Sequence, residues 1–294
     1  RITDFDQRRF GINLNIQKEI MALIGSKEGL AHLPIGILNP GEIAIIPDPA
    51  YPVYNTGTIL CDGFPYRIPL KKENKFLPEL AKIDPEIATK AKMLFINYPN
   101  NPTGAVADKD FFKEVIEFGK KYNIIIVHDL AYGEMGLEGY KPPSILEISG
   151  AKEIAVEFYS LSKTYNMSGW RIGALVGNEE VVDSFKNVKT NMDSGLFEVV
   201  QYAGIKALKG SQEIVGQMAQ LYQQRRDVAI SYLRELGWPI EPNKATFYLW
   251  IPVPEGYTSE DFSREVFKRT GVFFTPGTGY GSQGEGYVRL SLTL

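Results

Sequence analysis

Short apolar runs rich in β-branched residues alternate with amphipathic segments along most of the chain. Turn or polar residues bound each run, as is usual for buried strands of a parallel or mixed sheet. The runs predict strands at Ile43–Pro47, Met93–Asn97, Ile124–Val127, Ile154–Phe158 and Ile172–Val176. The segments between and after them predict helices at Asp108–Tyr122, Glu179–Asn191, Glu198–Leu208 and Glu213–Leu236. This alternation predicts an α/β fold, a three-layer α/β/α sandwich around a mostly parallel sheet.

The pattern changes after Gly237. A strand is predicted at Thr246–Ile251, a helix at Ser259–Thr270 and a second strand at Tyr287–Leu294. We therefore expect a large domain over residues 1–236 and a partial α+β small domain over residues 237–294. Arg1 has no methionine before it, and Leu294 falls inside an apolar strand, where natural chain ends are rare. We expect a chain that is truncated at both ends.

Composition narrows the class of protein. Apolar residues make up 44% and charged residues 23% of the 294, and the formal net charge is −3. A nucleic-acid surface would be strongly basic, and no run approaches the roughly 18 apolar residues of a membrane span. Cys61 has no partner for an internal disulfide, and His32 and His128 are too few for a histidine-rich metal site. We expect a cytoplasmic protein with no bound metal, nucleic acid or membrane.

The most informative segment is the twelve-residue string Ser160–Arg171, SLSKTYNMSGWR, between two predicted strands. Burial and nearby cations would lower the pKa of Lys163 and free its amine for Schiff-base formation. Ser160, Ser162 and Arg171 supply the hydroxyl donors and the planar cation that bind a phosphate. Lys163 alone would be read as an exposed loop lysine, and the whole string argues against that alternative.

This string resembles the cofactor-lysine motif of the fold-type I (class I/II) aminotransferases. Its sequence is closely similar to the motif of the LL-diaminopimelate aminotransferases. The similarity runs across nearly all of the chain. It implies pyridoxal 5′-phosphate as the cofactor and Lys163 as the lysine that holds it. In the family each active site is built from two subunits, so a homodimer is implied, with its interface beside Asn191–Gly195.

Two further motifs follow predicted strands. Asn101-Pro102-Thr103-Gly104 resembles the family's Asn-Pro-x-Gly turn, whose Asn binds the cofactor's phenolic oxygen and whose Asn–Pro bond is often cis. Asp129 ends a strand, where α/β folds place their ligands. The resemblance implies that Asp129 keeps the pyridine nitrogen protonated and that Tyr132 donates to the phenolic oxygen. The alternative for Asp129 is a helix N-cap.

Four other residues complete the candidate site. Ser26 and Lys27 open a predicted helix, whose N-terminus would bind the phosphate; a simple capped helix start is compatible with the same residues. Tyr51 matches the aromatic that stacks on the cofactor ring, although an aromatic is more often part of a core. A charge in an apolar strand is costly to bury unless it is paired. The resemblance implies that Arg289, with Asn101, binds the substrate carboxylate; the alternative is an edge-strand arginine facing solvent.

These motifs predict a transaminase with Lys163, Asp129 and Tyr132 as catalytic residues. The first choice of substrates is LL-diaminopimelate with 2-oxoglutarate, which belongs to lysine biosynthesis. That choice depends on the resemblance of three segments, residues 140–144, 191–195 and 244–248. The alternatives are an aspartate, alanine or aromatic aminotransferase, a non-catalytic aminotransferase-like module of a transcription regulator, and an inert relative. No basic DNA-binding segment supports the regulator.

Overall fold

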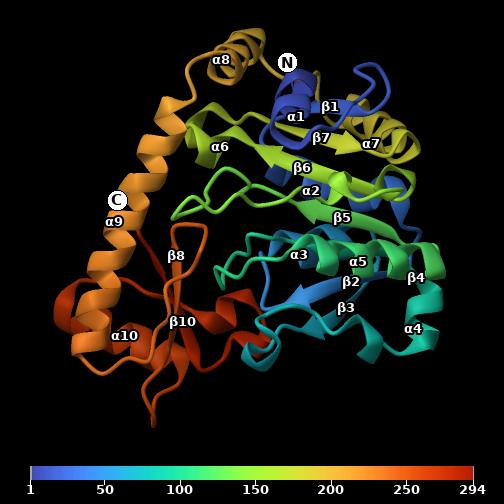
Figure 1. Cartoon of the computed structure of the whole chain (residues 1–294). Coiled ribbons are helices and arrows are strands. Elements are labelled where there is room, and N and C mark those ends of the chain that lie inside the picture. The colour runs from blue at the N-terminus through green and yellow to red at the C-terminus, as the bar shows by residue number, and fades with distance from the viewer. Residues whose placement is uncertain (1, 294) are drawn as a thin grey trace.

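The computed structural model describes residues 2–293, which contain a seven-stranded sheet in the order β1-β7-β6-β5-β4-β2-β3 (Figure 1). All neighbouring pairs from β6 to β3 are parallel, and β7 pairs antiparallel with both β6 and β1. The fold is therefore α/β with a mostly parallel sheet, as predicted. The strands are β1 (Ile20–Leu23), β2 (Ile43–Asp48), β3 (Phe64–Pro69), β4 (Ala91–Ile96), β5 (Ile125–Asp129), β6 (Ala155–Ser160) and β7 (Gly173–Gly177).

The five predicted strands correspond to β2, β4, β5, β6 and β7, with ends that differ by at most two residues. The two strands of this sheet that the sequence pattern did not predict, β1 and β3, lie at its edges. Their side chains are mostly exposed or half-buried, so neither strand has a continuous apolar run. β3 also carries Pro65 and Pro69, which an edge strand tolerates because it lacks one hydrogen-bonding neighbour.

Helices cover both faces of this sheet and divide its core into two clusters. On one face, α2 (Ser26–Ile37), α3 (Val53–Leu60) and α7 (Glu179–Met192) pack against the strands. On the other face lie α5 (Lys109–Tyr122) and α1 (Ile2–Phe10). Local signals fix α5: Asp108 caps its first turn, and Asn123 ends it with a left-handed φ of 55°. Shorter or more peripheral helices are α4 (Pro85–Lys90) and α8 (Glu198–Lys209).

A second, antiparallel sheet has the order β8-β10-β9 and is formed by β8 (Tyr248–Pro252), β9 (Thr275–Pro276) and β10 (Tyr287–Ser291). α10 (Ser259–Thr270) packs against it, and the long α9 (Glu213–Glu235) runs down one side of the molecule from α8 to α10 (Figure 1). The proposed domain boundary near Leu236 falls one residue after α9 and stays a prediction.

The last strand is shorter than predicted. β10 ends at Ser291, which pairs with Tyr248, the first residue of β8. Thr246, two residues earlier, has a φ of 70°, so the partner strand cannot extend the ladder further. The predicted strand end at Leu294 lies outside the described residues.

A buried carboxylate in α1 leads to a prediction about stability. Asp6 is fully buried, and burial raises its pKa to about 7, more than the nearby Tyr159 hydroxyl lowers it. The ordinary pKa of an aspartate in an unfolded chain is about 3.9. Between about pH 4 and 7 the folded state therefore binds more protons than the unfolded state, and stability falls as the pH rises through this window.

We expect Asp6→Asn to remove this decrease in stability with rising pH. At pH 8 the free energy of unfolding should rise by something on the order of 3 kcal/mol, because an ionised carboxylate no longer has to be buried. At pH 4 the two proteins should differ little. Urea unfolding at both pH values measures the effect, and Asp110→Asn, at an exposed position, serves as the control. Equal stability of wild type and Asp6→Asn at pH 8 would contradict this account.

Candidate active site

The carboxyl ends of β4, β5 and β6 meet at one edge of the large sheet, where the smaller sheet faces them. A cavity of about 410 Å³ lies there. Every residue that the sequence analysis assigned to a site lines this cavity: Ser26, Lys27, Tyr51, Asn101, Asp129, Tyr132, Ser160, Ser162, Lys163, Arg171 and Arg289. These residues span more than 260 positions of the chain, and only the fold brings them together.

Part of the cavity wall is suited to an anion. Ser26 and Lys27 form the first turn of α2, whose N-terminus carries a partial positive charge. The guanidinium of Arg171 lies beside this turn, with Nη1 3.4 Å from the Ser162 hydroxyl oxygen and 2.8 Å from the Ser168 carbonyl oxygen. Gly25 permits this approach, because a Cβ there would lie only 2.3 Å from Nη2 of Arg171. Hydroxyls, a helix N-terminus and a guanidinium together match a phosphate.

Asp129, the last residue of β5, presents a buried carboxylate that is only 4% exposed. Its Oδ2 accepts a hydrogen bond from the Tyr54 hydroxyl at 2.8 Å, and its Oδ1 accepts one from the Ala131 amide at 3.2 Å. Burial raises the pKa of Asp129, and these two bonds and His128 oppose the rise. The N-cap alternative is wrong, because turns rather than a helix follow β5. A buried carboxylate without a cation beside it favours a positively charged ligand.

Lys163 lies in α6 (Leu161–Thr164), immediately after β6. Its side chain is half-buried and lines the cavity, so the alternative of an exposed loop lysine is wrong. Burial lowers the pKa of Lys163, and the positive charges of Arg171 and Arg289 lower it further. A larger fraction of the amine is therefore neutral near physiological pH, which is the form that attacks a carbonyl or removes a proton.

Arg289 lies in the central strand of the small sheet, so the alternative of an edge-strand arginine is wrong. Its guanidinium carbon lies 4.0 Å from the ring centroid of Tyr248 and 4.8 Å from that of Tyr280. Nη1 donates to Oδ1 of Asn101 at 2.7 Å, whereas the buried Nε has no partner among the described residues. The two rings fix the plane of the guanidinium, and donors remain for a carboxylate.

The remaining predicted residues occupy the wall between these groups. The hydroxyl oxygen of Tyr132 lies 3.1 Å from that of Tyr248, and the Lys27 amine lies 5.8 Å from the Tyr51 ring centroid. Burial raises the pKa of Tyr51 to about 12, so its hydroxyl stays protonated. The peptide bond between Asn101 and Pro102 is cis.

Sequence reasoning missed several residues of the site. Asn97 follows β4, and its amide donates to the Asp129 carbonyl at 2.7 Å; its position at a strand end could have signalled it. Tyr248 was noted only within a resembling segment, without a role. Thr275 of β9 and Tyr280, in the 3-10 helix after β9, also line the cavity, and no local pattern marked them, because they approach through the tertiary fold.

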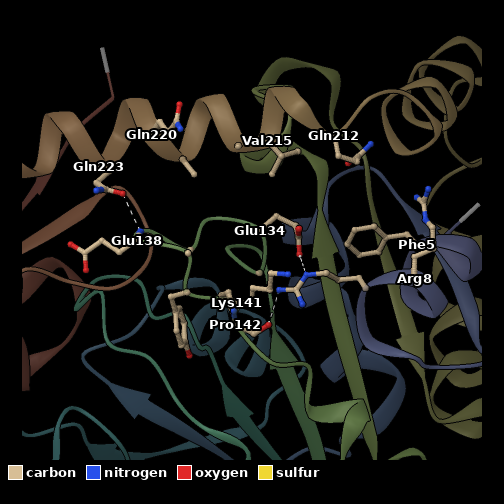
Figure 2. A pocket seen from close by; sticks show the side chains of 17 residues that line it. Phe5, Arg8, Glu134, Glu138, Lys141, Pro142, Gln212, Val215, Gln220 and Gln223 are labelled. Atoms are coloured by element: carbon tan, nitrogen blue, oxygen red, sulfur yellow. Dashed lines mark hydrogen bonds and ion pairs between the residues drawn. The ribbon is translucent and has the colours of Figure 1, made fainter.

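A second cavity of about 770 Å³ contains none of the predicted residues. It lies between α9 and the loop at residues 133–142, with α1 at one end (Figure 2). Arg9 is held there by Glu134, with Nε and Oε1 2.7 Å apart, and by the Pro142 carbonyl oxygen. The charges of Arg9 and Glu134 therefore already pair with each other.

Comparison with known proteins places this site in a family context. The family model described as aminotransferase class I and II matches residues 1–294. The chain is 55% identical to the LL-diaminopimelate aminotransferase of Halothermothrix orenii and 52% identical to that of Desulforudis audaxviator. Each match covers all of this chain and 75% of the relative. The substrate-bound BacF structure from Bacillus subtilis is 40% identical with a TM-score of 0.96, over 99% of this chain and 74% of that one.

Among the described residues, no helix is both long and apolar enough to cross a membrane.

Proposed function

The chain belongs to the class I and II aminotransferases and is a transaminase, and on this premise we propose that it binds pyridoxal 5′-phosphate and takes LL-diaminopimelate as its amino donor. The acceptor in this proposal is 2-oxoglutarate. The observation that carries it is the 50–55% identity to several LL-diaminopimelate aminotransferases over essentially the whole chain. The enzyme would then act in lysine biosynthesis.

The residues of the cavity fit pyridoxal 5′-phosphate. Ser26, Ser160, Ser162 and Arg171 would hold its phosphate, since they supply hydroxyl and guanidinium donors beside the N-terminus of α2. Within residues 2–293, no cation pairs with the buried carboxylate of Asp129, and a protonated pyridine nitrogen would supply one. Lys27 and Tyr51 line the same wall, as do Asn101 and Tyr132, which carry donors for the phenolic oxygen.

When bound, the cofactor supplies a protonated ring that accepts electron density from the substrate α-carbon. Lys163 Nζ would hold the cofactor, and its amine is the group of the cavity that would remove the α-proton as a general base. Asp129 would place a negative charge beside the ring nitrogen and so favour its protonated form. Arg289 and Asn101 fix the substrate carboxylate, and this fixes the α C–H bond relative to Lys163.

A donor screen tests the proposed substrate. We expect LL-diaminopimelate to have the highest kcat/KM with 2-oxoglutarate as the acceptor, in a panel that includes aspartate, alanine, phenylalanine and meso-diaminopimelate. The meso isomer has the same formula, so it controls for recognition of shape. A higher kcat/KM for aspartate, alanine or phenylalanine would move the enzyme to one of the alternative substrate classes and leave the family unchanged.

The proposed role of Arg289 makes a prediction about all substrates at once. Every amino and oxo acid has the same α-carboxylate, which a planar guanidinium can bind with two parallel hydrogen bonds and an ammonium cannot. We expect Arg289→Lys to lower kcat/KM by roughly 10- to 100-fold, a loss of about 1.4–2.7 kcal/mol, for each donor and acceptor.

The ratio of kcat/KM between donors should barely change in Arg289→Lys, because residues other than Arg289 bind the substrate side chain in this proposal. Steady-state kinetics with three donors of different size measures this. A loss confined to dicarboxylic donors would mean that Arg289 binds a side chain, and the proposed orientation of the substrate would be wrong.

We also propose a homodimer with its interface beside Asn191–Gly195. Large apolar side chains near this segment are unusually exposed: Met192 at 53%, Phe197 at 69%, Val199 at 56% and Tyr202 at 65%. Exposed apolar side chains gathered in one region are typical of interfaces. Light scattering on the purified protein tests the proposal, and a monomer at micromolar concentration would count against it.

A further inference from the structure

Tyr54 occupies a position behind the candidate active site. It lies in the first turn of α3 and is fully buried, with its ring stacked on Phe95 at a centroid distance of 5.0 Å and an interplanar angle of 16°. It does not line the cavity. Its hydroxyl donates to Oδ2 of Asp129 at 2.8 Å, which ties α3 to the end of β5.

Asp129 needs such a partner for a physical reason. A carboxylate in a buried site tends to take up a proton unless hydrogen bonds stabilise its charge. The described groups near it are Tyr54 from α3, His128 from β5, the Ala131 amide, and the tyrosines Tyr51 and Tyr132. No cation of the protein pairs with Asp129 among the described residues.

A tyrosine is suited to this role because its hydroxyl stabilises a carboxylate without cancelling its charge. A lysine or arginine at position 54 would neutralise Asp129 and remove its attraction for a cationic ligand. Burial and the neighbouring carboxylate hold the pKa of Tyr54 well above its usual range, so the phenol stays a donor. With Oδ2 occupied by Tyr54, the one bond that Oδ1 accepts within the described part of the chain is the long one from Ala131, so Oδ1 keeps acceptor capacity for a ligand.

We propose that Tyr54 is a positioning residue of the aminotransferase site, which orients the Asp129 carboxylate and keeps it ionised for the protonated ring nitrogen of the cofactor. The inference rests on the proposed function for the identity of the ligand. The state of Asp129 itself can be measured without cofactor.

Tyr54→Phe removes the hydroxyl and leaves the stacked ring in place. Infrared titration of the cofactor-free protein, with the Asp129 carboxyl band assigned by its loss in Asp129→Asn, reports protonation directly. We expect the acid dissociation constant of Asp129 to fall at least tenfold in Tyr54→Phe. Pyridoxamine 5′-phosphate, which cannot bond covalently to Lys163 through an aldehyde, should bind about tenfold more weakly by calorimetry.

Tyr98→Phe is the matched control. Tyr98 is also buried, and its hydroxyl donates to the Phe76 carbonyl at 2.7 Å, so both variants lose one buried phenol hydrogen bond. We expect Tyr98→Phe to leave both Asp129 protonation and pyridoxamine phosphate affinity within twofold of wild type. If Tyr54→Phe does not fold, 3-fluorotyrosine at position 54 tests the same bond, because its more acidic phenol should raise the dissociation constant of Asp129.

The outcomes separate the two proposals. An unchanged Asp129 band in Tyr54→Phe, or an equal change in Tyr98→Phe, would overturn the role of Tyr54 whatever the enzyme's substrates are. A shifted band together with failure of the wild type to bind pyridoxamine phosphate would support the Tyr54–Asp129 coupling and reject the cofactor.

Discussion

Lys163→Ala is expected to lower the rate of transamination by about 10⁴-fold, the upper end of what general acid–base catalysis contributes. The reason is that the variant loses both the amine that holds the cofactor and the base that removes the α-proton. Burial and two nearby guanidiniums lower the pKa of Lys163, so a larger fraction of the amine is in the neutral form that acts as a base. Among the described residues that line the cavity, the other lysine is Lys27, which lies at the start of α2 beside Tyr51 and is not expected to substitute for Lys163.

Single-turnover kinetics with LL-diaminopimelate measures the loss in Lys163→Ala. In the wild type, borohydride reduction followed by peptide mass spectrometry should fix the mass of the cofactor on the peptide that contains Lys163. A small primary amine in the buffer should restore part of the activity of Lys163→Ala, since the deleted side chain leaves room for it. Cofactor mass on another lysine, or retention of covalent binding in Lys163→Ala, would show that the assignment of Lys163 is wrong.

Asp129→Asn is expected to leave the protein folded and to slow removal of the α-proton by roughly 10³-fold, or about 4 kcal/mol of transition-state stabilisation. The substitution keeps the size of the side chain but removes the negative charge. The ring nitrogen then loses the anion that keeps it protonated, and it attracts electron density from the α-carbon less strongly. The amide introduced at position 129 would still be close enough to Tyr54 for a neutral hydrogen bond, so a large loss of stability is not expected.

The measurement is the single-turnover rate of Asp129→Asn loaded with cofactor, with the amount of bound cofactor determined separately. Asp6→Asn provides a matched control, because it neutralises another fully buried carboxylate outside the cavity. It should change the rate by less than about threefold, since Asp6 does not contact the reacting groups. A near-normal rate in Asp129→Asn would reject the electron-sink role, and an equal loss in both variants would point to a general effect of buried charge.

Much of the fold was predictable from local pattern. The strands β2, β4, β5 and β6 are largely buried on both faces, so most residues of each strand are apolar whatever its neighbours are. α5 was equally clear, because its apolar stripe and its cap at Asp108 are both local. The edge strands β1 and β3 were not predictable in this way, since their stability comes from pairing with β7 and β2.

The reactive groups of the site could partly be predicted from the sequence. Eleven side chains were predicted from sequence, and all of them line one cavity. They come from the string around Lys163, from the segment after β4, from the end of β5 and the residues after it, from the start of α2, from the residues before α3 and from β10. Their residue types predicted three kinds of group: donors that bind a phosphate, the carboxylate of Asp129 and the amine of Lys163. Sequence could not give the pairings among them, such as Asn101 with Arg289, which are 188 positions apart.

The sequence by itself thus determined the fold class and the inventory of reactive groups, because hydrophobic period and short motifs act within a few residues. The tertiary structure alone decided the environment of each group. In the folded protein the rings of Tyr248 and Tyr280 pack against the guanidinium of Arg289. Burial and two arginines lower the pKa of Lys163, and the Tyr54 hydroxyl donates a hydrogen bond to Asp129. Burial and electrostatic interaction depend on distance in space, and distance along the chain does not report it.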